Sequence, residues 1–290
     1  MTNPYFPPEE LLIDMKTRLL ELVKSYPSTN WYISSLLSVS LGLTDEELIV
    51  ANGASELIST ITSRLVNNLA VPVPTFNEYI NRAEIMGKHV SPYVLSGDFE
   101  LDPEEFVRHV TLTTANGALL IQPNNPTGTY VSKENMRYLL ESLRSLDVVM
   151  VDESFIEFVH SEDNPSTLDL IFEYPNLIIL KSLSKNYGIP GLRLGYAVSG
   201  NKSVVADLRR DLPIWNINSL AQFFLEEMPG YQEQFDRSCE LVRNATQRLY
   251  AGLQGVPYLN PYPTQGNFVL CRILYGFTGS ELTEHLFNEY

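Results

Sequence analysis

Three short apolar runs constrain the fold of this chain more than any other feature of its sequence. They cover residues 118–121, 148–151 and 177–180, and each one stops at polar residues. Short, uninterrupted apolar runs are typical of strands that are buried on both faces of a parallel sheet. Between the first two runs, residues 132–146 carry apolar side chains at helical spacing. This alternation predicts an α/β fold with a mostly parallel sheet and helices on both faces.

The remainder of the chain extends this pattern. Residues 49–50, 69–73 and 195–198 favour further strands, and residues 9–25 favour an amphipathic helix. A long helix is predicted over 231–253, a strand over 266–271 and a last helix from near Ser280. We therefore expect an N-terminal arm and helix over 1–25, a large domain over 26–228, and an incomplete smaller α/β domain over 229–290.

The predicted strands bring four residues toward one edge of the sheet. Gly53 follows the strand near residue 50, and Asn125 lies in a turn fixed by two prolines and a glycine. Asp152 ends the second apolar run, and Lys185 follows the third. Open α/β sheets bind ligands at the carboxyl ends of their strands. We therefore expect these residues to surround a binding site.

The stretch between residues 182 and 195 has a specific chemical pattern. Lys185 is flanked by Ser182 and Ser184, and Arg193 follows. A lysine can form a Schiff base with an aldehyde, while hydroxyl groups and an arginine suit a phosphate dianion. Pyridoxal 5′-phosphate carries both groups. A surface loop that happens to contain a lysine would show the same short motif, so the other strand ends must agree with it.

Two further contacts are suggested around the same edge. Ala54 and Ser55 open a predicted helix, where free backbone N–H groups could bind an anion. An ordinary N-cap would explain Ser55 equally well. Phe76 lies in the loop after residues 69–73, where it could either join the core or stack on a ligand.

Charge and composition exclude several other classes. The net charge is −15 and the pI is near 4.7, which argues against nucleic-acid or anionic-membrane partners. Cys239 and Cys271 have no metal-type spacing, and the four histidines are scattered singly, so no metal is expected. The glycines after Lys185 lack the G-x-G-x-x-G spacing of nicotinamide enzymes. No signal-like or membrane-length apolar run occurs, and we expect a cytoplasmic protein.

Taken together, the motifs resemble the class I/II aminotransferases of pyridoxal-phosphate fold type I. They are most similar to the branch of histidinol-phosphate aminotransferase and threonine-phosphate decarboxylase. The matching motifs are Asn-Asn-Pro-Thr-Gly with Asn125, Val-Asp-Glu-Ser-Phe with Asp152, and the stretch that holds Lys185 and Arg193. They occur in the family's order and with similar gaps. The resemblance extends from about residue 26 to residue 267 and implies pyridoxal 5′-phosphate as the cofactor.

The resemblance also implies a role for each matched residue. Lys185 would form the internal aldimine, and Asp152 would pair with the pyridine nitrogen of the cofactor. Asn125 would bind the phenolic oxygen, and Phe76 would stack on the ring. Contacts with the phosphate are implied for Ala54, Ser55, Ser182, Ser184 and Arg193. Tyr26 matches a tyrosine that reaches the phosphate in the neighbouring subunit, which implies a homodimer with shared active sites.

The chain departs from the family at two places. Phe155 stands where family aminotransferases usually have a tyrosine, and phenylalanine there resembles the decarboxylase side of the branch. The chain also ends before the segment that carries the family's carboxylate-binding arginine, so we expect either a fragment of a longer protein or another way of holding the substrate. Arg272 is one available cation, although a surface position is more typical of an arginine on an edge strand. Asn218 is expected to face the substrate or to cap a helix.

The sequence thus predicts an aminotransferase that moves an amino group between an amino acid and a 2-oxo acid, with the freed Lys185 amine as the base at Cα. Relatives often take phosphorylated amino acids, so a phosphorylated substrate is one expectation. Two alternatives stay open. One is an amino-acid decarboxylase that resembles threonine-phosphate decarboxylase, and the other is a non-catalytic module that binds pyridoxal phosphate.

Overall fold

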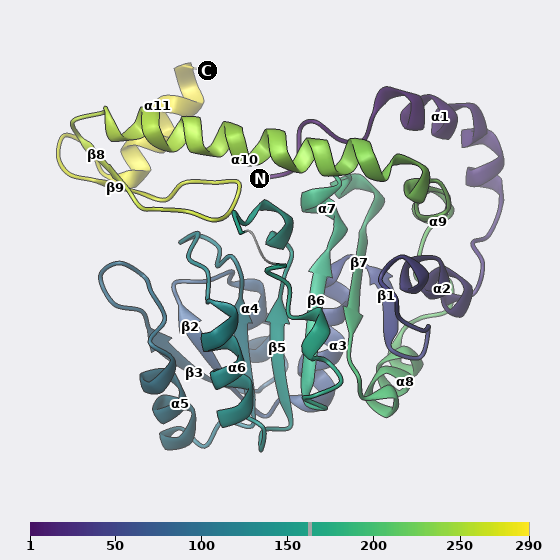
Figure 1. Ribbon diagram of the computed structural model, residues 1–290, viewed down its shortest axis with the longest axis horizontal. Helices are drawn as coiled ribbons and strands as arrows, with labels where there is room; N and C mark the ends of the chain where they lie inside the picture. The colour runs from purple at the N-terminus through teal and green to yellow at the C-terminus, as the bar shows by residue number, and fades with distance from the viewer. Residues whose placement is uncertain (162–163, 290) are drawn as a thin grey trace.

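A seven-stranded sheet forms the centre of the computed structural model, which describes residues 1–161 and 164–289 (Figure 1). The strand order is β1-β7-β6-β5-β4-β2-β3. The bounds are β1 Leu48–Asn52, β2 Asn68–Val73, β3 His89–Val94, β4 Gly117–Ile121, β5 Val148–Asp152, β6 Leu177–Ser182 and β7 Leu194–Val198. The pairs from β3 through β2, β4 and β5 to β6 are parallel, whereas β7 is antiparallel to both β6 and β1. The predicted mostly parallel sheet is confirmed.

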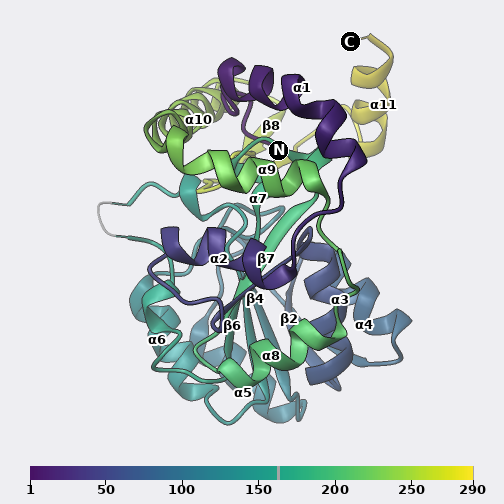
Figure 2. The ribbon, with the colours of Figure 1, turned by 90° about the vertical axis from the view of Figure 1, so that its right-hand side faces the viewer.

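Helices cover both faces of this sheet (Figure 2). Along β4, Ala118 and Leu120 pack into one core layer while Leu119 and Ile121 pack into the other, because successive side chains of a strand point to opposite faces. One layer receives apolar residues from α2 (Asn30–Ser40), α5 (Pro103–Leu112) and α6 (Lys133–Ser142). The other layer receives them from α3 (Ala54–Leu65), α4 (Glu78–Ile85) and α8 (Lys202–Asp211). Both faces are therefore buried, as the apolar runs predicted.

The carboxyl ends of the central strands are covered by further helices (Figure 1). These helices are α1 (Glu9–Lys24), α7 (Leu183–Asn186), α9 (Ser219–Glu227) and α10 (Gln232–Gln254). The 3₁₀ turns are η1 (Ile156–Phe158), η2 (Leu168–Leu170), η3 (Pro190–Leu192) and η4 (Met228–Tyr231). Phe6 before α1 and Phe235 of α10 are buried in the same core as the strands. The arm and the long helix thus pack directly onto the large domain.

The C-terminal part contains a two-stranded antiparallel sheet of β8 (Leu259–Pro261) and β9 (Cys271–Ile273), followed by α11 (Gly279–Glu289). The predicted strand over 266–271 is wrong except at Cys271. Phe268 instead packs edge-on against Phe155, with ring centroids 5.3 Å apart. Residues 266–270 thus lie outside any strand, and Phe268 contacts Phe155 of the large domain. No helix within the described ranges is both long and apolar enough to span a membrane.

Candidate active site

The carboxyl ends of β4, β5 and β6 and the turn after β1 surround one cavity of about 240 Å³. The turn after β1 reaches the same edge because β1 and β6 both run antiparallel to β7. Nine residues that the sequence placed in the site line this cavity: Ala54, Ser55, Phe76, Asn125, Asp152, Ser182, Ser184, Lys185 and Arg193. The structure therefore brings the separate motifs of the chain together.

Lys185 lies on α7, the single helical turn that continues directly from β6. The start of this turn is held in place because the backbone N–H of Ser182 donates to Ser154 Oγ at 2.9 Å. Lys185 itself is half-buried in the cavity wall. A small molecule bound in the cavity can therefore reach the amine of Lys185.

Asp152 is buried at the end of β5 and has a full set of hydrogen-bond donors. Tyr79 Oη donates to Oδ2 at 2.7 Å, and the N–H and Oγ of Ser154 donate to Oδ1 at 2.9 and 2.5 Å. Burial raises the pKa of Asp152 above 3.8, and the hydrogen bonds from Ser154 and Tyr79 oppose that rise. The carboxylate is thus fixed in place and ready to bind a cationic group.

Tyr79 and Ser154 were not singled out from the sequence. Tyr79 lies in the first turn of α4, three residues after Phe76, and the two rings pack edge-on with centroids 6.4 Å apart. Phe76 precedes the N-cap Asn77, so the two residues do not share a helix face, and no helical spacing pointed to Tyr79. Ser154 lies two residues after Asp152, and its hydroxyl connects that carboxylate to the strand carrying the lysine.

The opposite side of the cavity is a cradle for an anion. α3 starts after Gly53, which has a φ of +77° and provides no side-chain cap, so backbone N–H groups at this helix start remain free for an anion. A Cβ at Gly53 would lie 2.5 Å from Arg193 Nη2, and one at Gly195 would collide with the backbone nitrogen of Ala54. Arg193 Nη2 lies 3.4 Å from Ser55 Oγ. Glycines therefore allow the arginine and the helix start to approach each other.

Ser184 supplies an independent sign that this cradle accepts a polar group. Its hydroxyl is buried in the cavity wall and has no hydrogen-bond partner among the described residues. A buried polar group without a partner costs roughly 1–3 kcal/mol, so a ligand oxygen would relieve a real penalty there. An amine, an acid and a phosphate-sized donor set face one cavity, and these residues fit pyridoxal 5′-phosphate.

Two predicted site residues lie outside the cavity within this chain. Tyr26 is 78% exposed and stacks on Trp215, with ring centroids 4.3 Å apart. Asn218 caps α9, because its Oδ1 accepts from Ala221 N at 2.8 Å while its Nδ2 donates to Leu192 O at 2.9 Å. Of the two expectations for Asn218, the helix cap describes its contacts. Arg272 lies on β9 with its guanidinium 5.8 Å from the ring of Tyr262.

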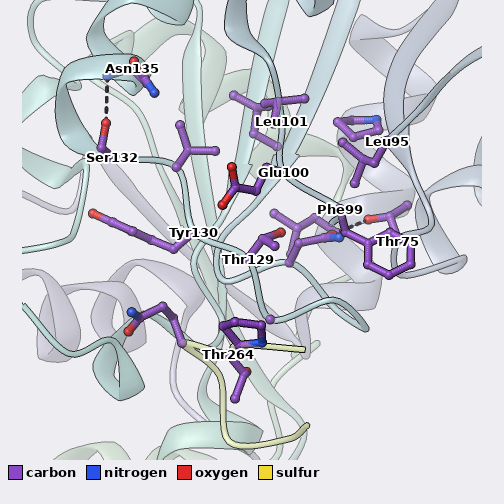
Figure 3. A pocket seen from close by; sticks show the side chains of 18 residues that line it. Thr75, Leu95, Phe99, Glu100, Leu101, Thr129, Tyr130, Ser132, Asn135 and Thr264 are labelled. Carbon is purple, nitrogen blue, oxygen red and sulfur yellow. Dashed lines mark hydrogen bonds between the residues drawn. The ribbon is translucent and has the colours of Figure 1, made fainter. Parts of the chain in front are cut away.

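A larger cavity of about 370 Å³ lies on the other side of the loop after β4, and Ile121 borders both cavities. Figure 3 shows Glu100, Thr129 and Tyr130 in its wall. Glu100 is the only charged side chain among the residues that line it. The larger cavity therefore lacks the amine and the cationic group that line the smaller one. The smaller cavity is the candidate active site.

A fold of this architecture, with an amine on the turn after one strand and an acid at the end of its neighbour, defines the pyridoxal-phosphate enzymes of fold type I. Comparison with known proteins narrows the class. The chain belongs to the aminotransferase class I and II family, whose description matches residues 6–290. Pyridoxal 5′-phosphate is the cofactor of this family.

Three relatives illustrate the range of the likeness. CMP-5′-(3-aminopropyl)phosphonate synthase of Streptomyces rubellomurinus is 34% identical over 99% of this chain and 45% of its own length. The L-serine phosphate decarboxylase of Sulfurospirillum multivorans is 29% identical over 100% of this chain and 77% of that protein. The crystal structure of histidinol-phosphate aminotransferase from Clostridium acetobutylicum is 26% identical with a TM-score of 0.90, covering 99% and 85% of the two chains. The chain thus spans about half the length of the synthase.

Proposed function

We propose that this chain catalyses the decarboxylation of an amino acid that carries a phosphate or phosphonate group. The observation that carries the proposal is Phe155, which is 4% exposed and lines the cavity where family aminotransferases usually have a tyrosine. The activities named for the synthase and the decarboxylase support this choice of reaction and substrate, since both involve amines or amino acids with a phosphorus-containing group.

Nine residues of the cavity have a role in this proposal. Bound cofactor supplies an electron-accepting ring that stabilises the charge left on Cα when a bond there breaks. Asp152 would hold a proton at the pyridine nitrogen, which would keep that ring positively charged. Lys185 would hold the cofactor through its aldehyde, and its amine would be placed to deliver a proton to Cα. Asn125 would bind the phenolic oxygen, and Phe76 would cover the ring. The phosphate would be held by Ala54, Ser55, Ser182, Ser184 and Arg193.

Phe155 affects the choice of reaction because it has no hydroxyl group and cannot donate a hydrogen bond. A tyrosine hydroxyl at this position would add a hydrogen bond to the phenolic oxygen, whereas Phe155 offers only an apolar ring packed on Phe268. One fewer donor leaves that oxygen to the Asn125 amide. The protonation of the cofactor next to Cα should therefore differ from that in the aminotransferases.

Amino transfer, which the sequence predicts, is the second candidate. It is favoured by the structural likeness to histidinol-phosphate aminotransferase, at a TM-score of 0.90. Both reactions use the same lysine and the same acid, and they differ in which bond at Cα is broken. The proposal therefore depends on product analysis.

The test uses the purified holoenzyme with O-phospho-L-serine. Release of carbon dioxide with a primary amine as the second product is the expected result. Formation of a 2-oxo acid that depends on added 2-oxoglutarate, without carbon dioxide, would replace decarboxylation by amino transfer. If a panel of phosphorylated and ordinary amino acids gives neither product, the chain is a non-catalytic module. Lys185→Ala is the control, and it should abolish every turnover.

We also propose that the chain acts as a homodimer in which Tyr26 contacts the cofactor phosphate of the partner subunit. Support comes from the position of Tyr26, which is exposed beside other exposed apolar residues. These residues are Leu19, Leu20 and Val23 of α1 and Trp215. A second copy would cover this surface and complete the phosphate site.

A further inference from the structure

The segment before α1 lies against the helical turn that carries the active-site lysine. The backbone N–H of Asn3 donates to Lys185 O at 2.8 Å. The side-chain Nδ2 of Asn3 donates to Asn186 O at 2.8 Å and to Ser238 Oγ at 2.7 Å, while its Oδ1 accepts from Tyr5 N at 2.9 Å. Asn3 is only 2% exposed. The backbone N–H and both polar side-chain atoms of this residue are thus used within the protein.

These contacts satisfy a need that arises from the length of α7. The last four carbonyl groups of a helix have no partner within the helix, and α7 contains only four residues, Leu183–Asn186. Leu183 O accepts from Tyr187 N, which leaves the later carbonyls to outside donors. Asn3 provides donors to two consecutive carbonyls, those of Lys185 and Asn186.

The surrounding chain fixes Asn3 closely against α7. Gly188 has a φ of +64°, and a Cβ there would lie 2.5 Å from Asn3 O and collide with Phe6 O. Phe6 is 3% exposed and packs edge-on against Tyr187 and Phe235, with ring centroids 5.6 Å apart in both pairs. The approach of the N-terminal segment therefore requires a glycine and is held by an aromatic anchor.

We propose that Asn3 is a positioning residue for Lys185. The front of α7 is fixed by the bond from Ser182 N to Ser154 Oγ, and its end is fixed by Asn3, so the lysine backbone is held from both sides. A displacement of about 1 Å at a reacting group can reduce a rate by about 100-fold. Asn3 thus acts on the reaction through the lysine, without touching substrate. This inference rests on the role of Lys185 in the proposed function.

The test is Asn3→Asp in the holoenzyme. This change keeps the size of the side chain and its backbone N–H but replaces the Nδ2 donor by an oxygen that faces two acceptors. We expect the pH midpoint of the cofactor's visible absorption band to shift, and kcat to fall about tenfold or more while KM changes less than about twofold. In the apoprotein, the acylation rate of Lys185 by an amine-reactive reagent, followed by peptide mass spectrometry, should change as well.

Two control variants separate positioning from general stability. Ser238→Ala removes one acceptor of Asn3 and leaves the bonds to Lys185 O and Asn186 O in place. Asn116→Ala removes the bonds that Asn116 makes with Asn67, Asn68 and Leu65, at the opposite end of the sheet. Both variants should lower Tm and leave the absorption midpoint and the acylation rate of Lys185 at the wild-type values.

The comparison of Asn3→Asp with the control variants tests the role of Asn3. A positioning role for Asn3 is overturned if the Asn3→Asp holoenzyme keeps the wild-type absorption midpoint and kcat. It is also overturned if the control variants shift the absorption midpoint equally at an equal loss of Tm. If Asn3→Asp does not fold, Asn3→Ala provides the same comparison with a smaller local charge change. Absence of a borohydride-reduced pyridoxyl label on Lys185 in the wild-type protein would instead refute the role of the lysine itself.

Discussion

A buried ion pair lies directly behind the residues of the candidate active site. Lys181, next to Ser182 on β6, contacts the carboxylate of Glu157 on η1, and the two side chains are 10% and 22% exposed. Burial alone would lower the pKa of Lys181, but the negative charge of Glu157 raises it above the usual value. Burial raises the pKa of the neighbouring Tyr196 to about 12, so that phenol stays neutral. Glu157 is therefore the counter-ion of Lys181.

This pair leads to a prediction about stability. Lys181→Met should destabilise the apoprotein by about 3–5 kcal/mol, because it leaves the Glu157 charge buried without a partner. The double variant Lys181→Met/Glu157→Leu should recover most of that loss, since both charges are removed together. Urea unfolding measures the difference. Arg108→Met breaks an exposed pair with Glu105 and should change stability little. A double variant that is less stable than Lys181→Met would contradict this account.

The pH dependence of the apoprotein should report the state of Asp152. Its pKa is raised by burial in the folded state, so the folded protein binds this proton more tightly than the unfolded chain does. The resulting stabilisation is complete below the ordinary value of 3.8 and is lost as the pH rises through the folded-state pKa. Asp152→Asn should lack this decline. Urea unfolding of both proteins from pH 3.5 upward tests it, and parallel stability curves would exclude a raised pKa.

The sequence predicted the motif residues at this scale but not the residues that support them. Lys185, Asp152 and Asn125 could be found because each follows a recognisable strand. The pairing of Tyr79 with Asp152 joins residues on different elements, and no local pattern encodes such a contact. The ion pair of Lys181 and Glu157 was missed for the same reason.

At the scale of elements, strands that are buried on both faces were the easiest to predict. β4, β5 and β6 lie where the apolar runs placed them, because a parallel strand under two helix layers needs apolar side chains on both faces. The edge strand β3 (His89–Val94) was not predicted, since it is only partly buried and contains Pro92. The antiparallel insertion of β7 between β6 and β1 could not be predicted either, because strand order depends on packing across the whole sheet.

The start of α3 gives a prediction about an element. Gly53→Ala should destabilise the apoprotein by about 1 kcal/mol or more, since alanine is strained at a φ of +77° and its methyl group would displace Arg193. Affinity for pyridoxal 5′-phosphate should fall with it, as measured by titration of the apoprotein. Gly252→Ala is the matched control. Gly252 lies in α10 with open space around it, so this change should stabilise by about 0.5–1 kcal/mol and leave cofactor affinity unaltered.

At the scale of the whole molecule, the C-terminal part contacts the large domain beside the larger cavity. Gln265 N donates to Gly128 O at 2.8 Å, and Gln265 Oε1 accepts from His160 N at 2.9 Å. Gly128 has a φ of +74°, and a Cβ there would collide with Thr264. These contacts connect three separate parts of the chain.

The proposed homodimer is tested by mixing an inactive variant with an impaired one. Lys185→Ala lacks the reacting amine, and Tyr26→Phe should weaken phosphate binding in the partner's site. If sites are shared, a mixed dimer contains one site in which both changes fall together and one site in which neither occurs. Mixing under conditions that exchange subunits should therefore restore about half of the wild-type activity per mixed dimer, which is about a quarter for a 1:1 statistical mixture. Activity equal to the sum of the separate variants would argue for independent sites.

The position of β7 also affects how the protein is made. Leu48 of β1 pairs with Val198 of β7, so β1 has no strand to join until the ribosome has completed residue 198 and released it from the exit tunnel. During most of translation, the segment that opens the anion cradle remains separated from the strand that delivers the lysine. Contacts between such distant parts of a chain form slowly. We expect the pocket to be among the last regions to acquire native structure in the nascent chain, and early aggregation to begin at the unpaired edge of β1.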